Sequence, residues 1–181
     1  MHNFVDLQPY GDNRQLRMVV ETPRGSNIKL DYEPELRAFT VSRALPLGLV
    51  YPYDWGFIPG TKGEDGDPID ALAVHDGATY PGVILPCRPL GVVELVQKGA
   101  KGPIENPRVI LMPIWHDRMG ELEKASDLPA RVKAEIEQFF LSATLFTDKQ
   151  AKVTGWRGPN AAHKLINASP VSYTHLTLPT I

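Results

Sequence analysis

The order of residue patterns along the chain constrains the fold most strongly. Up to about residue 114 the sequence consists of short alternating or β-branched apolar runs separated by glycine and proline, and no helical periodicity appears there. Such runs predict strands at 15–21, 28–32, 38–42, 69–74, 91–96 and 109–114. Residues 50–59 are aromatic and interrupted by glycine and proline, which argues against a helix without establishing a strand.

Helical spacing begins only after Asp127. Apolar residues then recur at the spacing of one helix face, namely Val132, Ile136, Phe139, Phe140 and Ala143. Asp127 suits the N-cap of this helix and Pro129 its first turn. Gly155 and Pro159 bound a second helix, over 160–168. Strands followed by helices predict a single α+β domain over 1–169, with a small closed or nearly closed barrel and helices packed outside it.

Charge and composition narrow the class of protein. The 181 residues include 19 basic and 21 acidic side chains, for a net charge of −2, so no basic excess suggests a nucleic-acid partner. The single cysteine, Cys87, excludes an internal disulfide and a multi-cysteine zinc site. No stretch has the length of a signal peptide's apolar region or of a membrane span. We therefore expect a soluble cytoplasmic protein without a membrane partner.

Other catalytic patterns are not met. The five histidines, His2, His75, His116, His163 and His175, lack the spacing of metal ligands. The sequence has neither a Gly-x-Ser-x-Gly elbow nor a phosphate-binding Gly-x-x-x-x-Gly-Lys-Ser/Thr loop. Cys87, between Pro86 and Arg88, is expected to be structural.

The most informative segment is the loop Asp65-Gly-Asp-Pro-Ile-Asp70. Its three aspartates are spaced i, i+2 and i+5, with Gly66 allowing a sharp turn and Pro68 stiffening it. Carboxylates this dense repel one another unless cations lie among them, and oxygen ligands suit Mg²⁺, Mn²⁺ or Ca²⁺. The apolar run that follows would hold Asp70 at the start of a core strand. A solvated hairpin tip remains the alternative on this segment alone, whereas an EF-hand loop would need a ligand where Ile69 stands.

This loop resembles the signature of the family I soluble inorganic pyrophosphatases. The similarity extends from about Met18 to Ala168 and includes Lys29, Arg43 and the Tyr51-Pro52 pair in family order. The resemblance implies a five-stranded OB-type barrel with flanking strands and two C-terminal helices. It implies hydrolysis of pyrophosphate to two phosphates by a metal-activated water, with Mg²⁺ as the cofactor and Mn²⁺ or Co²⁺ as possible replacements. It also implies a homo-oligomer, a hexamer in bacterial relatives.

Roles for individual residues follow from the same resemblance. Asp65 and Asp70 would bind the metal pair, and Asp67 would act as the general base or orient the water as a third metal contact. Lys29, Arg43 and Arg108 would bind the phosphates, since fixed cations must offset the charge of the departing phosphate. Glu21 would contact water bound to the metal.

The chain departs from the family pattern around this core. Asp31 replaces a glutamate, Trp55 replaces a substrate-binding tyrosine, and Arg108 replaces a lysine. Two further metal-binding aspartates of the family fall at Gln97 and near Asn106, with Glu105 beside it. A tyrosine–lysine pair that binds phosphate becomes Ala143-Thr144, although Thr144 keeps one hydroxyl, and Lys149 or Lys152 can partly restore the charge. We expect a divergent branch with weaker substrate binding or a changed metal preference.

Two other functions stay open at this point. A metal-dependent hydrolase of another small phosphoanhydride is suggested by the changes at Trp55 and at Ala143-Thr144. A non-enzymatic OB barrel that binds nucleic acid or a partner is the second alternative, since OB barrels often do so. The aspartate loop argues against it because anionic loops repel phosphate backbones.

The end of the chain differs in character from what precedes it. Residues 171–180 resemble a translated sequencing-library adapter. We expect 170–181 to be a non-native tail and the natural sequence to stop at about Ser169.

Overall fold

The computed structural model describes residues 3–115 and 122–171. In this part of the chain the strands are β1 (Leu16–Thr22), β2 (Ile28–Glu33), β3 (Ala38–Ala44), β4 (Asp54–Ile58), β5 (Ile69–Ala73), β6 (Ile84–Gly99), β7 (Gly102–Glu105), β8 (Arg108–Pro113) and β9 (Lys152–Arg157). The helices are α1 (Ala130–Ala143) and α2 (Pro159–Ala168), with short 3₁₀ turns η1 (Phe4–Asp6) and η2 (Ala125–Asp127). Eight of these strands precede α1, whereas β9 lies between the two helices, where no strand was predicted. The α+β prediction is confirmed.

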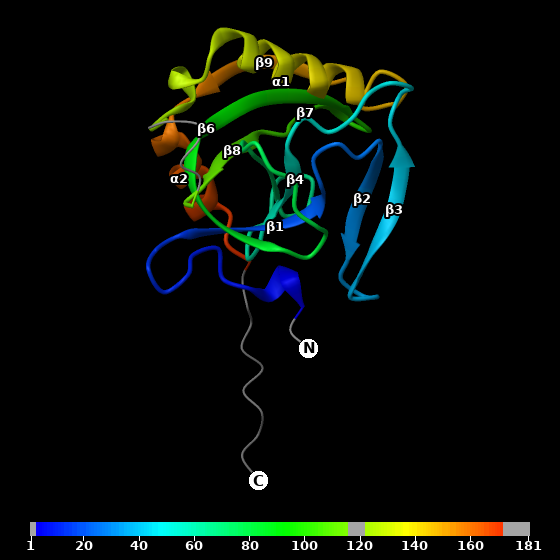
Figure 1. Ribbon diagram of the computed structural model, residues 1–181. Helices are drawn as coiled ribbons and strands as arrows, with labels where there is room; N and C mark the ends of the chain where they lie inside the picture. Colours follow the sequence, from blue (N-terminus) through cyan, green and yellow to red (C-terminus); the bar gives the residue numbers. More distant parts are fainter. Residues whose placement is uncertain (1–2, 116–121, 172–181) are drawn as a thin grey trace.

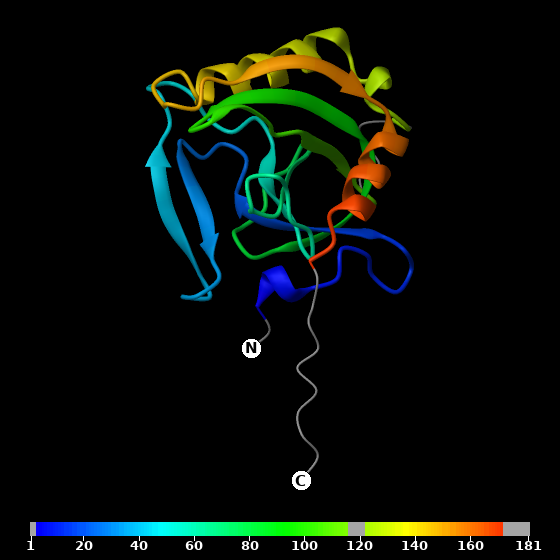
Figure 2. The same cartoon turned by 180° about the vertical axis from the view of Figure 1, so that it is seen from behind.

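Five strands close into a ring. They pair in the order β1–β4–β5–β8–β6, and β6 pairs back with β1. The β5–β8 pair is parallel and the other pairs of the ring are antiparallel. β7 and β9 extend the sheet from β6, and β2–β3 form a separate hairpin. Figures 1 and 2 show this ring with α1 outside it, alongside β6 and β9, and with α2 and the β2–β3 hairpin on opposite sides. The expected five-stranded OB-type barrel with flanking strands is confirmed.

Apolar side chains form two clusters, one on each face of the barrel strands. One cluster takes alternate residues from all five barrel strands together with Ala162 and Ile166 of α2. The other packs α1, through Ile136, Phe139 and Phe140, against residues of β4, β5, β6 and β8. The alternation of β5 divides between them, because Ala71 belongs to the first cluster and Leu72 to the second. Polar residues at the ends of the strands on the α1 side therefore meet below this helix.

One glycine is required for the ring to close. Gly56 of β4 lies opposite Val20 of β1, and a Cβ atom placed on Gly56 would stand 1.9 Å from the carbonyl oxygen of Val19. No side chain fits at this separation, so the glycine permits the close approach of the two strands. This requirement explains a glycine in the middle of a fully buried strand.

The first helix starts differently from the prediction. α1 begins at Ala130 with Pro129 at the N-cap, and Asp127 ends the preceding 3₁₀ turn. The Asp127 carboxylate accepts hydrogen bonds from the backbone N–H groups of Glu123 and Lys124, each at 3.1 Å. Asp127 thus stabilises the turn before α1 and does not cap the helix itself. α2 begins at Pro159, one residue earlier than predicted, and Gly155 lies within β9.

The segment after α2 returns to the barrel. The Lys62 N–H donates to the Ser169 carbonyl at 2.8 Å, and the Val171 N–H donates to the Gly60 carbonyl at 3.1 Å. Pro170 also forms a β-bridge with Thr61. Residues 172–181 lie outside the described part of the chain, so the proposed boundary at 169 stays a prediction, as does the foreign origin of the tail.

Candidate active site

A cavity of about 640 Å³ lies where the barrel, the β2–β3 hairpin and the end of α1 meet. Its walls come from six barrel and hairpin strands (β1–β4, β6 and β8), from β5 and the loop before it, and from the end of α1 with the segment that follows. The site residues expected from sequence that line it are Glu21, Lys29, Asp31, Arg43, Trp55, Asp65, Asp67, Asp70, Asn106, Arg108 and Thr144. Carboxylates and cations that are far apart in sequence therefore share one pocket.

The carboxylate loop is shaped by its own backbone. Gly66 adopts φ +92°, a conformation that disfavours other residues, and this turn brings the Gly63 N–H to the Asp67 carbonyl at 2.7 Å. The Asp67 N–H in turn donates to the Asp65 carboxylate at 3.2 Å. The Asp67 side chain is exposed and makes no hydrogen bond or ion pair within residues 3–115 and 122–171. Asp67 is thus the carboxylate of this loop that stands free in the pocket.

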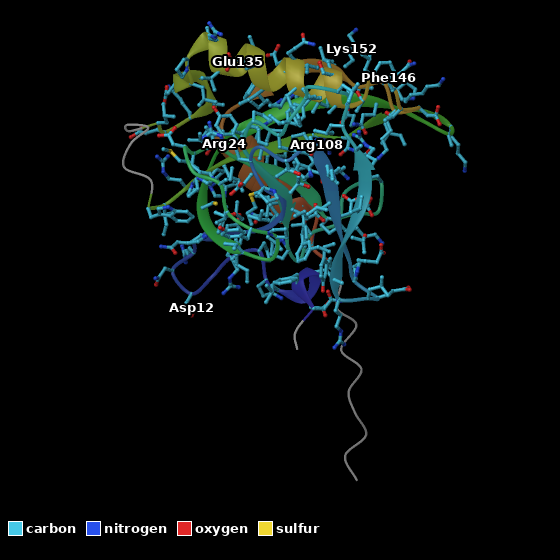
Figure 3. The ribbon with its side chains drawn as sticks, turned by 45° about the vertical axis from the view of Figure 1, so that its right-hand side comes forward. Asp12, Arg24, Arg108, Glu135, Phe146 and Lys152 are labelled. Carbon is cyan, nitrogen blue, oxygen red and sulfur yellow. The ribbon has the colours of Figure 1, made fainter. Side chains whose placement is uncertain are left out.

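Strand register brings Asp70 to Arg108. Ala71 of β5 pairs with Val109 of the parallel strand β8, so the preceding residues, Asp70 and Arg108, are neighbours on the face that looks toward α1. Their side chains form an ion pair, and Arg108 is only 6% exposed. The Arg108 guanidinium also lies over the ring of Trp55, 5.3 Å from its centroid. Figure 3 shows Arg108 deep within the outline of the molecule, while Asp12, Glu135, Phe146 and Lys152 lie at its edge.

One amide, that of Asn106, connects this arginine to the carboxylate loop, and a second amide, that of Gln97, accepts from it. Arg108 donates to Asn106 Oδ1, and Asn106 Nδ2 donates to Asp65 Oδ2 at 3.2 Å and to Gln97 Oε1 at 3.1 Å. The orientation of the Asn106 amide is fixed by chemistry, because a guanidinium can only donate and must therefore face an oxygen. The amide nitrogen then has to face Asp65. Arg108, Asn106 and Gln97 consequently form one connected network along the wall opposite the loop.

The hairpin supplies two further cations. Lys29 of β2 and Arg43 of β3 are directly paired residues, so their side chains leave the hairpin on the same face. Lys29 forms an ion pair with Asp31. Burial alone would raise the pKa of Asp31, but the ammonium of Lys29 outweighs it and lowers that pKa below its ordinary value. Arg43 has no ion-pair partner among the described residues and is available to an anion.

Burial changes the pKa values of several acidic groups that line the cavity. The Glu21 carboxylate is 8% exposed and accepts a hydrogen bond from the Tyr32 N–H at 2.8 Å. Burial raises the pKa of Glu21 to about 8. Burial also raises the pKa of Asp70, and the charge of Arg108 offsets only part of that rise. Tyr51, a buried pocket residue to which sequence reasoning gave no site role, has a pKa raised by burial as well.

Some predicted residues are arranged otherwise. Glu105 is exposed at the end of β7 and does not line the cavity. The Thr144 hydroxyl lies near the Phe140 and Leu141 carbonyls at the end of α1 and accepts from the Ala151 N–H, so it already has partners within the chain. Lys149 lines the cavity, whereas Lys152 does not. Of the two lysines considered as replacements for the lost charge, only Lys149 is in position.

The donors suit a hard divalent cation by their chemistry. Asp65, Asp67 and Asp70 offer carboxylate oxygens, and all three line the cavity. In the arrangement described, no group of three or more acidic, histidine or cysteine side chains converges as a metal site among the residues described, because Asp70 is turned to Arg108 and Asp65 to Asn106. The three carboxylates are therefore of the type that binds a divalent cation. In this arrangement Asp70 is paired with Arg108, and Asp65 accepts a hydrogen bond from Asn106.

A small closed barrel whose end brings carboxylates to face lysine and arginine side chains is the arrangement of an enzyme that acts on a small polyanionic phosphate. The sequence profile of the inorganic pyrophosphatases matches residues 18–174. The inorganic pyrophosphatase of Thermus thermophilus is 37% identical over 178 residues, which are 96% of this chain and 99% of the relative. The chain belongs to the inorganic pyrophosphatase family.

Other relatives and solved structures agree with this assignment. The inorganic pyrophosphatase of Sulfolobus acidocaldarius is 35% identical over 83% of this chain and 87% of its own length. The crystal structure of the Thermus thermophilus enzyme matches with a TM-score of 0.84, covering 92% of this chain and 96% of that one. The Helicobacter pylori enzyme matches with a TM-score of 0.82 at 30% identity, over 90% and 95% of the two chains. None of the helices described here is both long and apolar enough to span a bilayer.

Proposed function

We infer that the chain hydrolyses inorganic pyrophosphate to two phosphates in the cavity beneath α1. The observation that carries this inference is the meeting of the Asp65–Asp70 loop with Lys29, Arg43 and Arg108 around a single cavity. A polyanionic substrate needs the cations, and attack by water needs a base or an equivalent way to activate it. Membership of the inorganic pyrophosphatase family supports the same reaction.

Asp65, Asp67 and Asp70 are proposed to hold the divalent cation that the reaction needs. Mg²⁺ is the expected ion, with Mn²⁺ or Co²⁺ as replacements, because the donors are hard carboxylate oxygens. A divalent cation at these residues supplies Lewis acidity, which makes water more acidic and offsets negative charge on the phosphates. Glu21, whose carboxyl lies close enough to Asp70 for their charges to interact, adds a buried acid on the same side.

The protein's own groups divide the remaining work. Asp67 has no partner in the described part of the chain, so its carboxylate can accept a proton from the attacking water or orient that water. Arg43 and Lys149 line the cavity without an ion pair among the described residues and are placed to bind phosphate oxygens. Lys29 and Arg108 are held by Asp31 and Asp70, and they contribute charge from fixed positions. Together these cations would stabilise the phosphate that leaves.

The test is phosphate release from pyrophosphate in the presence of Mg²⁺, with the variant Asp67→Asn. We expect a fall of about 10²- to 10⁴-fold in kcat, the usual contribution of a general base. Asp12→Asn, a change of the same kind at the edge of the molecule (Figure 3), serves as the matched control and should keep full activity. Undiminished hydrolysis by Asp67→Asn would exclude the role given to this carboxylate.

Substrate preference separates the alternatives. Faster release of phosphate from tripolyphosphate or a nucleoside triphosphate than from pyrophosphate would favour a different phosphoanhydride hydrolase. Tight binding of an oligonucleotide without turnover of any of these compounds would favour a binding module. We expect neither, since the cavity combines acidic and basic walls and the net charge of −2 discourages nucleic acid.

The cellular setting is proposed on the same basis. We propose a cytoplasmic enzyme that forms a homo-oligomer, a hexamer by resemblance to bacterial relatives, from a single domain over 1–169. Light scattering of the purified chain measures the assembly, and a monomer would contradict the proposal. Amplifying the gene from source DNA tests whether 170–181 is a foreign tail.

A further inference from the structure

The loop that carries the carboxylates is closed at its neck, residues 60–62, by the hydroxyl of Thr61. The Thr61 O–H donates to the carbonyl of Ile58, the last residue of β4, at 2.6 Å. The same oxygen accepts from the N–H of Ile69, the first residue of β5, at 3.0 Å. Thr61 is only 2% exposed, so both bonds lie where little water competes for them. One side chain therefore joins the two strands at the point where the loop leaves the barrel.

The backbone of the neck is held by segments that come from opposite ends of the sequence. The Gly60 N–H donates to the Val5 carbonyl at 3.1 Å, and the Lys62 N–H donates to the Ser169 carbonyl at 2.8 Å. Figure 1 shows η1 and the C-terminal end of α2 on the side of the ring away from α1. The neck is thus fixed from three directions, by the two strands and by both of these segments.

The carboxylates lie beyond this neck, in a part of the loop that is itself exposed. Asp65 and Asp67 are exposed, whereas Thr61 and Ile69 are buried. Asp70 follows Ile69 directly, so the hydrogen bond to the Ile69 N–H also fixes where Asp70 begins. Ligands of a cation must be held within about 0.5 Å of a productive position. A change at the neck is therefore transmitted to all three carboxylates.

We propose that Thr61 is a positioning residue for the carboxylates of the cavity, acting through the hydroxyl that ties β4 to β5. This inference rests on the proposed function for the role of those carboxylates as ligands of a divalent cation. Thr61 does not line the cavity, so it acts on a cation only through the loop. Its effect should appear in how strongly the loop binds a cation as well as in turnover.

Two substitutions separate the hydroxyl from the shape of the side chain. Thr61→Val keeps the shape and removes the hydroxyl, whereas Thr61→Ser keeps the hydroxyl. Binding of Mn²⁺ without substrate is measured by electron paramagnetic resonance of the free ion. We expect Thr61→Val to bind Mn²⁺ about tenfold more weakly than the unmodified chain, as is usual when a group that orients metal ligands is lost, and Thr61→Ser to stay within about twofold. Equal Mn²⁺ affinities of the two variants would overturn the proposal.

Thr22 offers a matched control for loss of stability. Its hydroxyl donates to the Leu30 carbonyl at 3.1 Å and accepts from the Leu30 N–H at 2.9 Å, and Thr22 is fully buried. Thr22→Val therefore removes two bonds of the same kind from β1, where they hold the β2–β3 hairpin and not the loop. It should lower stability by a similar amount and leave Mn²⁺ affinity unchanged. A loss of Mn²⁺ affinity as large as that in Thr61→Val would indicate general destabilisation and overturn the proposal.

Turnover gives a second readout. Lys29, Arg43 and Arg108, which are proposed to bind the phosphates, come from β2, β3 and β8 and not from the loop. With saturating Mg²⁺, Thr61→Val should therefore lower kcat for pyrophosphate about tenfold and change KM by less than about threefold. A rise in KM at unchanged kcat would assign the effect to phosphate binding and overturn the proposal.

Folding of each variant is checked by circular dichroism. If Thr61→Val does not fold, Thr61→Cys decides instead, because a thiol is a weak donor and a weak acceptor and so weakens the bridge without removing it. Its Mn²⁺ affinity should fall about threefold, and an unchanged affinity would overturn the proposal. If the unmodified chain releases no phosphate from pyrophosphate, the proposed function is refuted, while the Mn²⁺ affinities still decide the role of Thr61.

Discussion

The guanidinium carbon of Arg108 lies 5.3 Å from the centroid of the Trp55 ring, so the arginine that forms an ion pair with Asp70 also contacts an aromatic face. Trp55 is itself buried, and its ring contacts Tyr51 and Phe140. The tryptophan at this position therefore offers the site a flat support for a cation.

Replacing this support should weaken substrate binding. Trp55→Leu removes the aromatic face, and we expect kcat/KM for pyrophosphate to fall about tenfold, since a cation–π contact contributes roughly 0.5–2 kcal/mol. Trp55→Phe keeps the face and should lose less than about threefold. The indole nitrogen of Trp55 is buried without a hydrogen-bond partner among the described residues, so Trp55→Phe loses no hydrogen bond. Steady-state kinetics on both variants check this, and equal losses would show that the ring face does not matter.

Stability should depend on pH through Glu21. Burial raises the pKa of Glu21 from 4.5 to about 8, so between these values the folded chain keeps a proton that the unfolded chain releases. The folded state then binds more protons, and the free energy of unfolding falls as pH rises through this window and levels off above it. Glu21→Gln cannot ionise, and it should stabilise the metal-free protein at about pH 9 by roughly 1–3 kcal/mol.

Urea unfolding of both proteins at about pH 5 and about pH 9 measures this difference. The gain from Glu21→Gln should be small at the lower pH, where the carboxyl is protonated in the folded state. Parallel pH profiles of the two proteins would mean that Glu21 titrates normally in the folded chain.

Lys149 should partly restore the phosphate-binding charge that is missing at Ala143-Thr144. It lines the cavity, and its backbone carbonyl is anchored by the Lys98 N–H at 2.6 Å. Lys149→Gln removes one partly solvated charge, so we expect KM for pyrophosphate to rise roughly three- to tenfold, in line with about 1 kcal/mol for an exposed ionic contact. Lys152→Gln, three residues away and outside the cavity, is the matched control. A similar rise in both variants would indicate a general effect of charge.

Closure of the barrel should depend on Gly56. An alanine there would bring its Cβ to 1.9 Å from the Val19 carbonyl oxygen, which forces β1 and β4 apart. We expect Gly56→Ala to lower the free energy of unfolding by more than about 3 kcal/mol, at the upper end of overpacking costs. Gly11→Ala, whose nearest neighbour is the flexible guanidinium of Arg17 at 3.4 Å, should change it by less than about 1 kcal/mol. Thermal unfolding compares the two, and a stable Gly56→Ala variant would contradict the packing argument.

Sequence patterns predicted the strands whose apolar residues are bounded by clear breaks, and missed those set by distant partners. β4 carries no alternating pattern in the sequence, because all five of its residues, Asp54–Ile58, are buried. β6 extends well beyond the predicted 91–96 because it tolerates Pro86 and Pro89 within its length. β9 forms by pairing with β6, a contact between segments more than fifty residues apart that local patterns do not contain.

The candidate site likewise contains features that the sequence predicts and features that it does not. The spacing of the aspartates and the resemblance of Lys29, Arg43 and Arg108 to family positions predicted which residues gather around the cavity. The sequence could not predict that the Asn106 amide nitrogen faces Asp65, or that the Thr144 hydroxyl bonds to a backbone carbonyl at the end of α1. Those arrangements depend on side-chain torsions that respond to neighbours from several strands, and no single segment encodes them.

The sixteen-residue strand β6 is hydrogen-bonded to β1, β7, β8 and β9, and α2 packs against it. Because the ring, its extension and the last helix all depend on this one segment, none of them can open without disturbing the others. Its central amides should therefore exchange with solvent only through global unfolding. The same dependence makes the fold slow to assemble, since the strand must find partners from both ends of the chain before any part of the barrel is complete.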